Sequence, residues 1–205
     1  MTFYKLKCIL KKTPICRLDM DKKYDNKKFE EEIKNYWQDE QVYALDKAAI
    51  EKGNFFRVDT PPPTVSGSLH IGHIFSYTQT DIITRYQRML GNPAFYPIGF
   101  DDNGLPTERF VEKKKKVSSF KLGRSEFIKL CLEVTHEVEE EFKELWKKLG
   151  LSIDWNYTYS TISPNVRKLS QESFLNLLEK GFVYRKEEPA LYCTACRTSV
   201  AQAEL

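Results

Sequence analysis

Residues 55–108 constrain the fold more than any other stretch, because their hydrophobic pattern changes period twice. Residues 55–59 alternate apolar and polar side chains, which predicts a strand, and residues 61–67 carry three prolines that exclude both helix and ladder. Apolar side chains then recur at helical spacing over residues 71–89, before a glycine and a proline that stop a helix. A second apolar run covers residues 94–100. Strand, helix and strand of this length predict a parallel segment of an α/β fold.

Two loops of this segment carry polar residues. If the strands are parallel, both loops leave carboxyl ends, which form the edge where open α/β sheets bind ligands. The first loop leads into a helix start with His70 and His73, where free N–H groups, the helix dipole and two imidazoles favour an anion. The second loop, from Asp101 to Glu108, supplies carboxylates. The two loops together predict a site for a polyphosphate-like anion and an ammonium group.

Two signatures on this segment resemble those of one enzyme family. PPPTVSGSLHIGH, residues 61–73, resembles the His-x-Gly-His signature of class I aminoacyl-tRNA synthetases in the form found in the valyl enzymes. GFDDNGLPTE, residues 99–108, resembles the matching signature of the valyl, isoleucyl and leucyl group. A lone His-x-Gly-His recurs by chance, whereas two long matches on one strand-helix-strand segment are specific.

The resemblance implies an α/β fold: the first half of a Rossmann-like, parallel-sheet, nucleotide-binding catalytic domain, preceded by an N-terminal helix. We expect residues 21–185 to form this half-domain and residues 186–205 to begin the connective insertion that leads to an editing domain. Residues 1–20 have no clear period, which favours a disordered extension or translation that starts at Met20. The family's Lys-Met-Ser-Lys-Ser loop does not occur in the sequence, so we expect an N-terminal fragment that is inactive alone.

The reaction that the resemblance implies is that of a valine–tRNA ligase. Valine attacks the α-phosphate of ATP, bound with Mg²⁺, to give valyl-adenylate and pyrophosphate, and the valyl group then passes to tRNA(Val). Such an in-line displacement needs positioned reactants and stabilised charge on phosphate oxygens. The resemblance gives this task to His70 and His73, and Gly72 between them lets a base or a phosphate of ATP approach the backbone. Two histidines at this spacing could instead bind a metal, although no third ligand lies nearby in the sequence.

Other site residues follow from their positions in the two signatures. Pro61 and Pro62 match positions that line the amino-acid pocket, where fixed backbone angles keep the wall rigid and carbonyl groups face an ammonium. Asp101 matches the acidic residue that binds the substrate ammonium through a charge-assisted contact. Thr64 and Gly67 match ATP-binding positions, although the valyl enzymes most often carry asparagine where Thr64 stands.

Several alternatives stay open. Asp102, Asn103 and Glu108 have no assigned role, and capping of the following helix is an equal alternative for them. GFDDNGLPTE departs from the form of many bacterial valyl enzymes towards the isoleucyl and leucyl form, whereas the triple proline favours the valyl enzymes. An isoleucine–tRNA ligase, another nucleotidyl-transferring enzyme of the superfamily and a non-catalytic RNA-binding paralogue are the competing functions.

Cys193 and Cys196 have the spacing of a zinc knuckle, which is half of a tetrahedral thiolate site. Cys8, Cys16 and Cys131 are scattered singly, so no second pair lies within reach. In the resembled family such segments open the connective insertion, and partner cysteines can come later in the chain. This implies a Zn²⁺ site for the full-length protein and not for these residues alone. Five cysteines, an odd number, fit reduced thiols in a cytosolic protein better than a disulfide framework.

Composition and periodicity add further expectations. The formal net charge of +3 neither demands nor excludes a nucleic-acid partner. No apolar run reaches about 18 residues, so we expect no membrane partner and a cytoplasmic location; the resemblance adds a monomeric full-length protein. Amphipathic helices are predicted over residues 125–149 and 163–181, and short β-structure over residues 182–205. The lysines of residues 113–116 indicate a solvated helix face, with RNA phosphates as the alternative partner.

Overall fold

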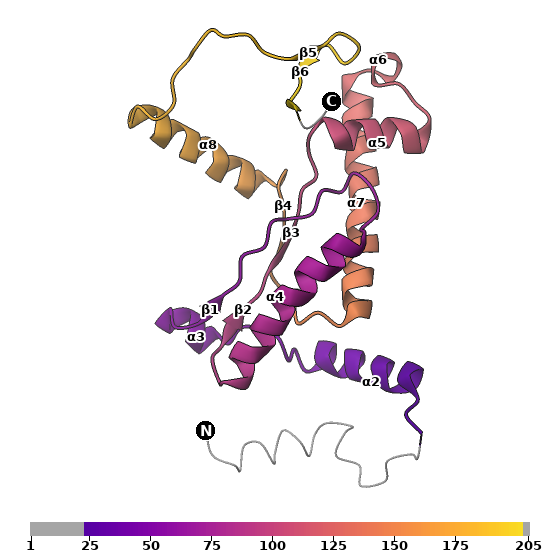
Figure 1. Ribbon diagram of the computed structural model, residues 1–205, viewed down its shortest axis with the longest axis vertical. Coiled ribbons are helices and arrows are strands. Elements are labelled where there is room, and N and C mark those ends of the chain that lie inside the picture. The colour runs from indigo at the N-terminus through magenta and orange to yellow at the C-terminus, as the bar shows by residue number, and fades with distance from the viewer. Residues whose placement is uncertain (1–22, 203–205) are drawn as a thin grey trace. The chain divides into compact units, whose positions relative to one another are not determined.

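The computed structural model describes residues 23–202 and is shown in Figure 1. The expectation for residues 1–20 lies outside this range. The described chain forms two compact units, each built from several segments. The first unit contains residues 23–63, 68–99 and 137–159, and the second contains residues 64–67, 100–136 and 160–202.

Helices dominate the chain, and the strands between them are short (Figure 1). The helices are α2 (Asn26–Asp39), α3 (Lys47–Lys52), α4 (Ile71–Met89), α5 (Leu105–Lys115), α6 (Ser119–Leu122), α7 (Arg124–Leu149) and α8 (Pro164–Glu179). The strands are β1 (Phe56–Arg57), β2 (Ala94–Phe95), β3 (Ile98–Phe100), β4 (Thr158–Ser160), β5 (Tyr192–Cys193) and β6 (Thr198–Ser199).

The predicted strand-helix-strand segment is confirmed within the first unit. β1 pairs with β2 in parallel, with Phe56 opposite Ala94, and α4 connects the two strands. The prediction of a single strand over residues 94–100 is wrong, because this run divides into β2 and β3. Pro97 stands at the break, and it has no N–H group to donate to a ladder.

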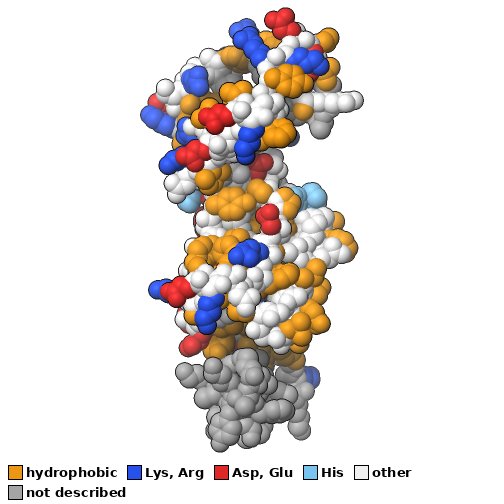
Figure 2. Space-filling view, turned by 90° about the vertical axis from the view of Figure 1, so that its left-hand side faces the viewer, with side chains coloured by type: hydrophobic (Ala, Val, Ile, Leu, Met, Phe, Trp, Pro, Cys, Tyr) orange, Lys and Arg blue, Asp and Glu red, His pale blue; other side chains and the backbone are white. Residues whose placement is uncertain are grey.

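α4 has the predicted ends but not the burial that its pattern suggests. The helix begins after His70, and Gly91 ends it in the left-handed conformation, with a φ of +85°. Its buried residues are Tyr77, Asp81 and Thr84. The large apolar side chains that predicted the helix are exposed: Ile71, Phe75, Ile82, Tyr86 and Met89. Figure 2 shows hydrophobic side chains, in orange, lying open on the surface. Periodicity therefore located the helix, while polar partners decided which side is covered.

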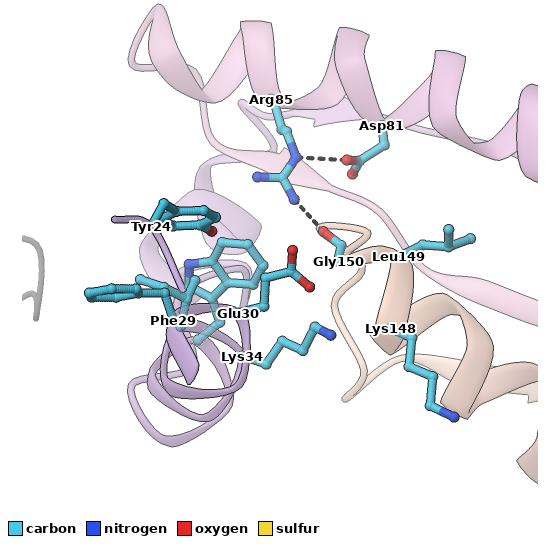
Figure 3. A pocket seen from close by; sticks show the side chains of 11 residues that line it. Tyr24, Phe29, Glu30, Lys34, Asp81, Arg85, Lys148, Leu149 and Gly150 are labelled. Carbon is cyan, nitrogen blue, oxygen red and sulfur yellow. Dashed lines mark hydrogen bonds and ion pairs between the residues drawn. The ribbon is translucent and has the colours of Figure 1, made fainter. Parts of the chain in front are cut away.

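A polar network joins α4 to the turn that follows α7. Asp81 Oδ1 accepts hydrogen bonds from the backbone N–H and the hydroxyl of Ser152, at 2.7 and 2.5 Å. Arg85 forms an ion pair with Asp81 Oδ2 at 2.6 Å and donates to the Gly150 carbonyl (Figure 3). Because these bonds satisfy a buried carboxylate, Asp81 can occupy the covered side of α4. The cavity beside the network, of about 420 Å³, contains none of the predicted site residues.

Aromatic side chains fill the core of the first unit. Trp146 is fully buried, with its ring centroid 5.0 Å from that of Tyr77 and 6.0 Å from that of Phe142. Tyr96 and Ile98, on either side of Pro97, are buried as well. Burial raises the pKa of Tyr96. The predicted helix over residues 125–149 is confirmed as α7, whose C-terminal half supplies this core.

In the second unit, Val111 of α5 packs with Phe127 and Val134 of α7. α8 starts as predicted: the Ser163 hydroxyl accepts the Val166 N–H at 3.4 Å, and a proline opens the helix. α8 has no buried residue. The predicted β-structure near the C-terminus is confirmed as the antiparallel pair β5 and β6. Within residues 23–202, no helix combines the length and the apolar character needed to cross a membrane.

Candidate active site

The two histidines of the first signature cap the N-terminus of α4. His70 is the N-cap residue, and its Nδ1 accepts a hydrogen bond from the backbone N–H of Gly72 at 3.1 Å. His73 accepts the backbone N–H of His70 on its own Nδ1 at 3.3 Å. The ring centroids are 4.0 Å apart. The structure thus brings the two predicted catalytic residues together.

These hydrogen bonds also assign the ring protons. A ring nitrogen that accepts a hydrogen bond carries no proton, so each neutral imidazole has its proton on Nε2. The pKa of His73 lies below its usual value, because partial burial disfavours the charged ring and His70 lies beside it. His73 is therefore neutral at pH 7. The pair presents two Nε2–H donors beside a helix N-terminus, an arrangement suited to phosphate oxygens.

Gly72 has a steric role that its motif position does not reveal. A Cβ atom at this residue would lie 2.9 Å from Cε1 and 3.0 Å from Nδ1 of His70. Glycine therefore leaves room for the His70 ring to fold back over the first turn of α4. The predicted approach of ATP to this backbone stays a prediction.

Tyr77 is a residue of this site that the sequence analysis missed. Its hydroxyl donates to the Pro61 carbonyl at 2.7 Å, and burial raises its pKa to about 12. The Pro61 carbonyl, expected to face an ammonium, thus already accepts one hydrogen bond. Tyr77 lies four residues after His73, on the same side of α4. That spacing was the sequence signal that could have identified Tyr77. The Tyr77 hydroxyl joins α4 to the proline loop.

In the second unit, the structure brings Thr64 and Asp101 together. They form an isolated parallel bridge, and the Val65 N–H donates to the Asp101 carbonyl at 3.0 Å. Two predicted site residues that are far apart in the sequence therefore lie side by side. Asp101 is half-buried, and Thr64 is exposed.

Thr161 contacts both aspartates of the second signature, and no sequence signal marked it. Its hydroxyl donates to Asp101 Oδ1 at 3.3 Å and accepts the Asp102 N–H at 3.0 Å. The Thr161 N–H donates to the Phe100 carbonyl at 3.0 Å, which holds the residue beside the end of β3.

Asp102 is not the helix cap that was one alternative for it. The N-cap residue of α5 is Gly104, which makes no side-chain capping bond. The Asp102 side chain is instead buried, and its Oδ2 accepts a hydrogen bond from the Ser160 hydroxyl. Among the described residues, its Oδ1 has no hydrogen-bond partner. Asp102 therefore holds the loop that follows β3 through a buried contact with Ser160, while Asp101 is the more accessible carboxylate.

The predicted site residues divide between the two units. The first contains Pro61, Pro62, His70, Gly72 and His73, and the second contains Thr64, Gly67, Asp101, Cys193 and Cys196. Within the units the structure joins the histidine pair and the pair of Thr64 with Asp101. Pro62 is half-buried, and Gly67 has open space where a Cβ would stand.

Cys193 and Cys196 form a knuckle-like turn. The Cys196 N–H donates to Cys193 Sγ at 3.3 Å. This hydrogen bond is the largest cause that lowers the pKa of Cys193. Arg109 Nη2 donates to Cys196 Sγ at 2.7 Å. The two sulfurs fit two of the four ligands of a structural zinc site. Within residues 23–202, no group of three or more metal-binding side chains forms.

Comparison with known proteins identifies the family. Residues 32–205 match the family described as tRNA synthetases class I (I, L, M and V). The chain is 54% identical over 187 residues to the valine–tRNA ligase of Rickettsia prowazekii (strain Madrid E), covering 91% of this chain and 23% of that protein. It is 52% identical over 187 residues to the valine–tRNA ligase of Rickettsia felis, covering 22% of that protein. The chain thus spans less than a quarter of the length of these relatives.

A solved structure confirms the fold class. It is a LeuRS of Agrobacterium radiobacter K84, determined in a ternary complex with tRNA and LeuAMS. The match has a TM-score of 0.71 and 26% sequence identity, and covers 88% of this chain and 21% of that one. The predicted α/β catalytic fold of class I synthetases is therefore confirmed. The chain belongs to the class I tRNA synthetases of the isoleucyl, leucyl, methionyl and valyl group.

Proposed function

We propose that this chain carries the amino-acid activation site of a valine–tRNA ligase. The full-length protein would join valine to ATP as valyl-adenylate, release pyrophosphate, and transfer the valyl group to tRNA(Val). The relatives named as valine–tRNA ligases, at 54% and 52% identity, support valine as the amino acid.

The histidine pair at the start of α4 is the observation that carries this proposal. Attack on the α-phosphate builds negative charge on phosphate oxygens, and preorganised donors stabilise such charge without having to reorient. His70 and His73 offer two Nε2–H donors whose rings are already fixed through Nδ1. The N-terminal end of α4 adds its dipole.

We assign the other predicted site residues to the binding of valine, ATP and Zn²⁺. Asp101 would bind the valine ammonium, with Pro61 and Pro62 lining the amino-acid pocket. Thr64 and Gly67 would contact ATP, which binds with Mg²⁺. Cys193 and Cys196 would supply two ligands to a structural Zn²⁺ in the full-length protein. We propose a cytoplasmic, monomeric enzyme.

Amino-acid-dependent ATP–pyrophosphate exchange by the full-length protein tests the proposal. Valine, isoleucine, leucine and threonine are compared at equal concentration. We expect the fastest exchange with valine and a weak reaction with threonine, because an apolar pocket rejects that isostere poorly, a problem for which valyl-tRNA synthetases are the standard example. Fastest exchange with isoleucine would move the substrate assignment, and no exchange with any of the four would overturn the proposal.

A further inference from the structure

We propose that Thr161 is a positioning residue for Asp101, and that its hydroxyl fixes the carboxylate that binds the substrate ammonium. This inference rests on the proposed function, since it concerns how the amino acid is held. It adds a residue of the second unit that lies outside both signatures.

The hydroxyl of Thr161 has one proton to donate, and its surroundings determine where that proton goes. The oxygen accepts the Asp102 N–H at 3.0 Å. A backbone N–H cannot accept a hydrogen bond, so the hydroxyl proton must be directed elsewhere. Asp101 Oδ1 lies 3.3 Å away and accepts it. Thr161 therefore acts as a donor towards Asp101.

The position of Thr161 is fixed by backbone contacts as well. Its N–H donates to the Phe100 carbonyl at 3.0 Å, directly before the two aspartates. The preceding residue, Ser160, donates its hydroxyl to Asp102. Two consecutive hydroxyls at the carboxyl end of β4, of Ser160 and Thr161, thus bind two consecutive carboxylates after β3. Side-chain and backbone bonds together leave Thr161 little freedom to reorient.

This arrangement decides which of the two carboxylates a ligand can use. Asp102 is buried, with 5% of its surface exposed, whereas Asp101 is half-buried. With Oδ1 of Asp101 held by Thr161, the carboxylate keeps Oδ2 and its remaining lone pairs for an ammonium N–H. A carboxylate fixed before binding loses less freedom when the ligand arrives, which favours affinity.

Replacing the hydroxyl by a methyl group tests the inference in the full-length protein. Thr161→Val keeps the shape of the side chain and removes both the hydrogen bond donated to Asp101 and the one accepted from the Asp102 N–H. We expect the KM for valine in pyrophosphate exchange to rise roughly tenfold, the effect of losing one hydrogen bond to a charged group, with the KM for ATP within about twofold. Thr161→Ser keeps the hydroxyl and should stay close to the wild type. An unchanged valine KM in Thr161→Val, or equal rises for both substrates, would overturn the inference.

A ligand without the ammonium group separates positioning from general damage. Isovalerate has the side chain and carboxylate of valine but no amino group. Its inhibition constant should change much less than the valine KM in Thr161→Val, because the lost bond to Asp101 serves only the ammonium site. If isovalerate binding weakens as much as valine binding, Thr161 has only a structural role.

Ser160→Ala is the matched control, since it removes the neighbouring hydroxyl that binds Asp102. We expect a lower melting temperature and an unchanged ratio of the two KM values. A rise in valine KM equal to that of Thr161→Val would mean that any loosening of the loop has this effect, which would overturn the inference. Thr161→Ala replaces Thr161→Val if the valine variant does not fold, with the same expected result.

Asp101→Asn separates a failure of the proposed ammonium site from a failure of the role of Thr161. It should raise the valine KM more than the ATP KM. If it does not, the proposed ammonium site itself is wrong. If it does and Thr161→Val has no effect, only the role of Thr161 fails.

Discussion

His73 accepts the backbone N–H of His70 on its Nδ1, so the second histidine of the signature holds the residue that caps its own helix. In each ring, Nδ1 therefore accepts a backbone hydrogen bond at the helix start, and Nε2 remains to bind a ligand. The two roles can be separated by substitution, since amide side chains reproduce one ring nitrogen or the other.

Replacement of His73 by asparagine should remove activity while sparing the helix cap. The asparagine oxygen occupies the place of Nδ1, and the Nε2–H donor is lost. We expect the activation barrier for adenylate formation to rise by about 2–4 kcal/mol, as for the loss of one preorganised donor. Pre-steady-state exchange and thermal unfolding provide the measurements.

Glutamine at the same position is the reciprocal control, because its amide nitrogen takes the place of Nε2. His73→Gln should retain more activity than His73→Asn and lose more stability, by about 1 kcal/mol for a lost cap. Equal rates in the two variants would show that His73 does not act through Nε2.

Stability should depend on pH through His73. Its pKa in the folded protein lies below the ordinary value of 6.5, so the folded state binds this proton less readily than the unfolded chain. The contribution of His73 to the free energy of unfolding should therefore be fully present above about pH 6.5 and be lost as the pH falls from there through the lower pKa of the folded state. Urea unfolding at pH 7.5 and at pH 5.5, roughly one pH unit above and below the ordinary pKa, measures the decrease. A wild type and His73→Asn with the same pH dependence would contradict the assignment.

Gly72→Ala should impair activity although alanine is the better helix former. The new Cβ would approach Cε1 of His70 to 2.9 Å and displace the ring from the first turn. We expect at least a roughly tenfold slower exchange, with no gain of the ~1 kcal/mol that alanine brings to an unobstructed helix. Gln79→Ala, at an exposed position of the same helix, serves as the control and should match the wild type.

Tyr77→Phe removes the bond to the Pro61 carbonyl and little else. Loss of one buried hydrogen bond should cost about 1 kcal/mol of stability. Because the proline loop is then less well fixed, the valine KM should rise by a few fold while the rate at saturation changes little. Steady-state exchange kinetics would reveal it, and an unaltered KM would mean that Tyr77 only stabilises the core.

Local signals predicted the ends of two helices. Gly91 marked the end of α4, and Ser163 with its following proline marked the start of α8, because such signals lie within one turn. The cap formed by His70 and the short helices α3 and α6 were not predicted. Parallel pairing of β1 and β2 also followed from the length of the connection. The divided strand around Pro97 was harder, since apolar runs do not show where a ladder breaks.

Contacts between distant residues could not be predicted. Thr161 reaches Asp101 across 60 positions, and nothing in its neighbourhood marks a hydroxyl that faces a carboxylate. Tyr77 carried no prediction, and only the structure shows that its hydroxyl donates to the Pro61 carbonyl, 16 residues away. The sequence pattern did not show which side of α4 is covered, for the same reason. Asp81 is buried because Ser152, 71 residues away in the sequence, donates hydrogen bonds to it.

The hydroxyl of Tyr77 ties the loop that would hold valine to the helix that would hold ATP. Ordering either segment then removes part of the entropy that the other must lose, so each ligand lowers the cost of admitting the second. Valine and ATP should consequently bind with positive cooperativity. Calorimetric titration of valine with and without a non-hydrolysable ATP analogue measures that coupling, and Tyr77→Phe should weaken it.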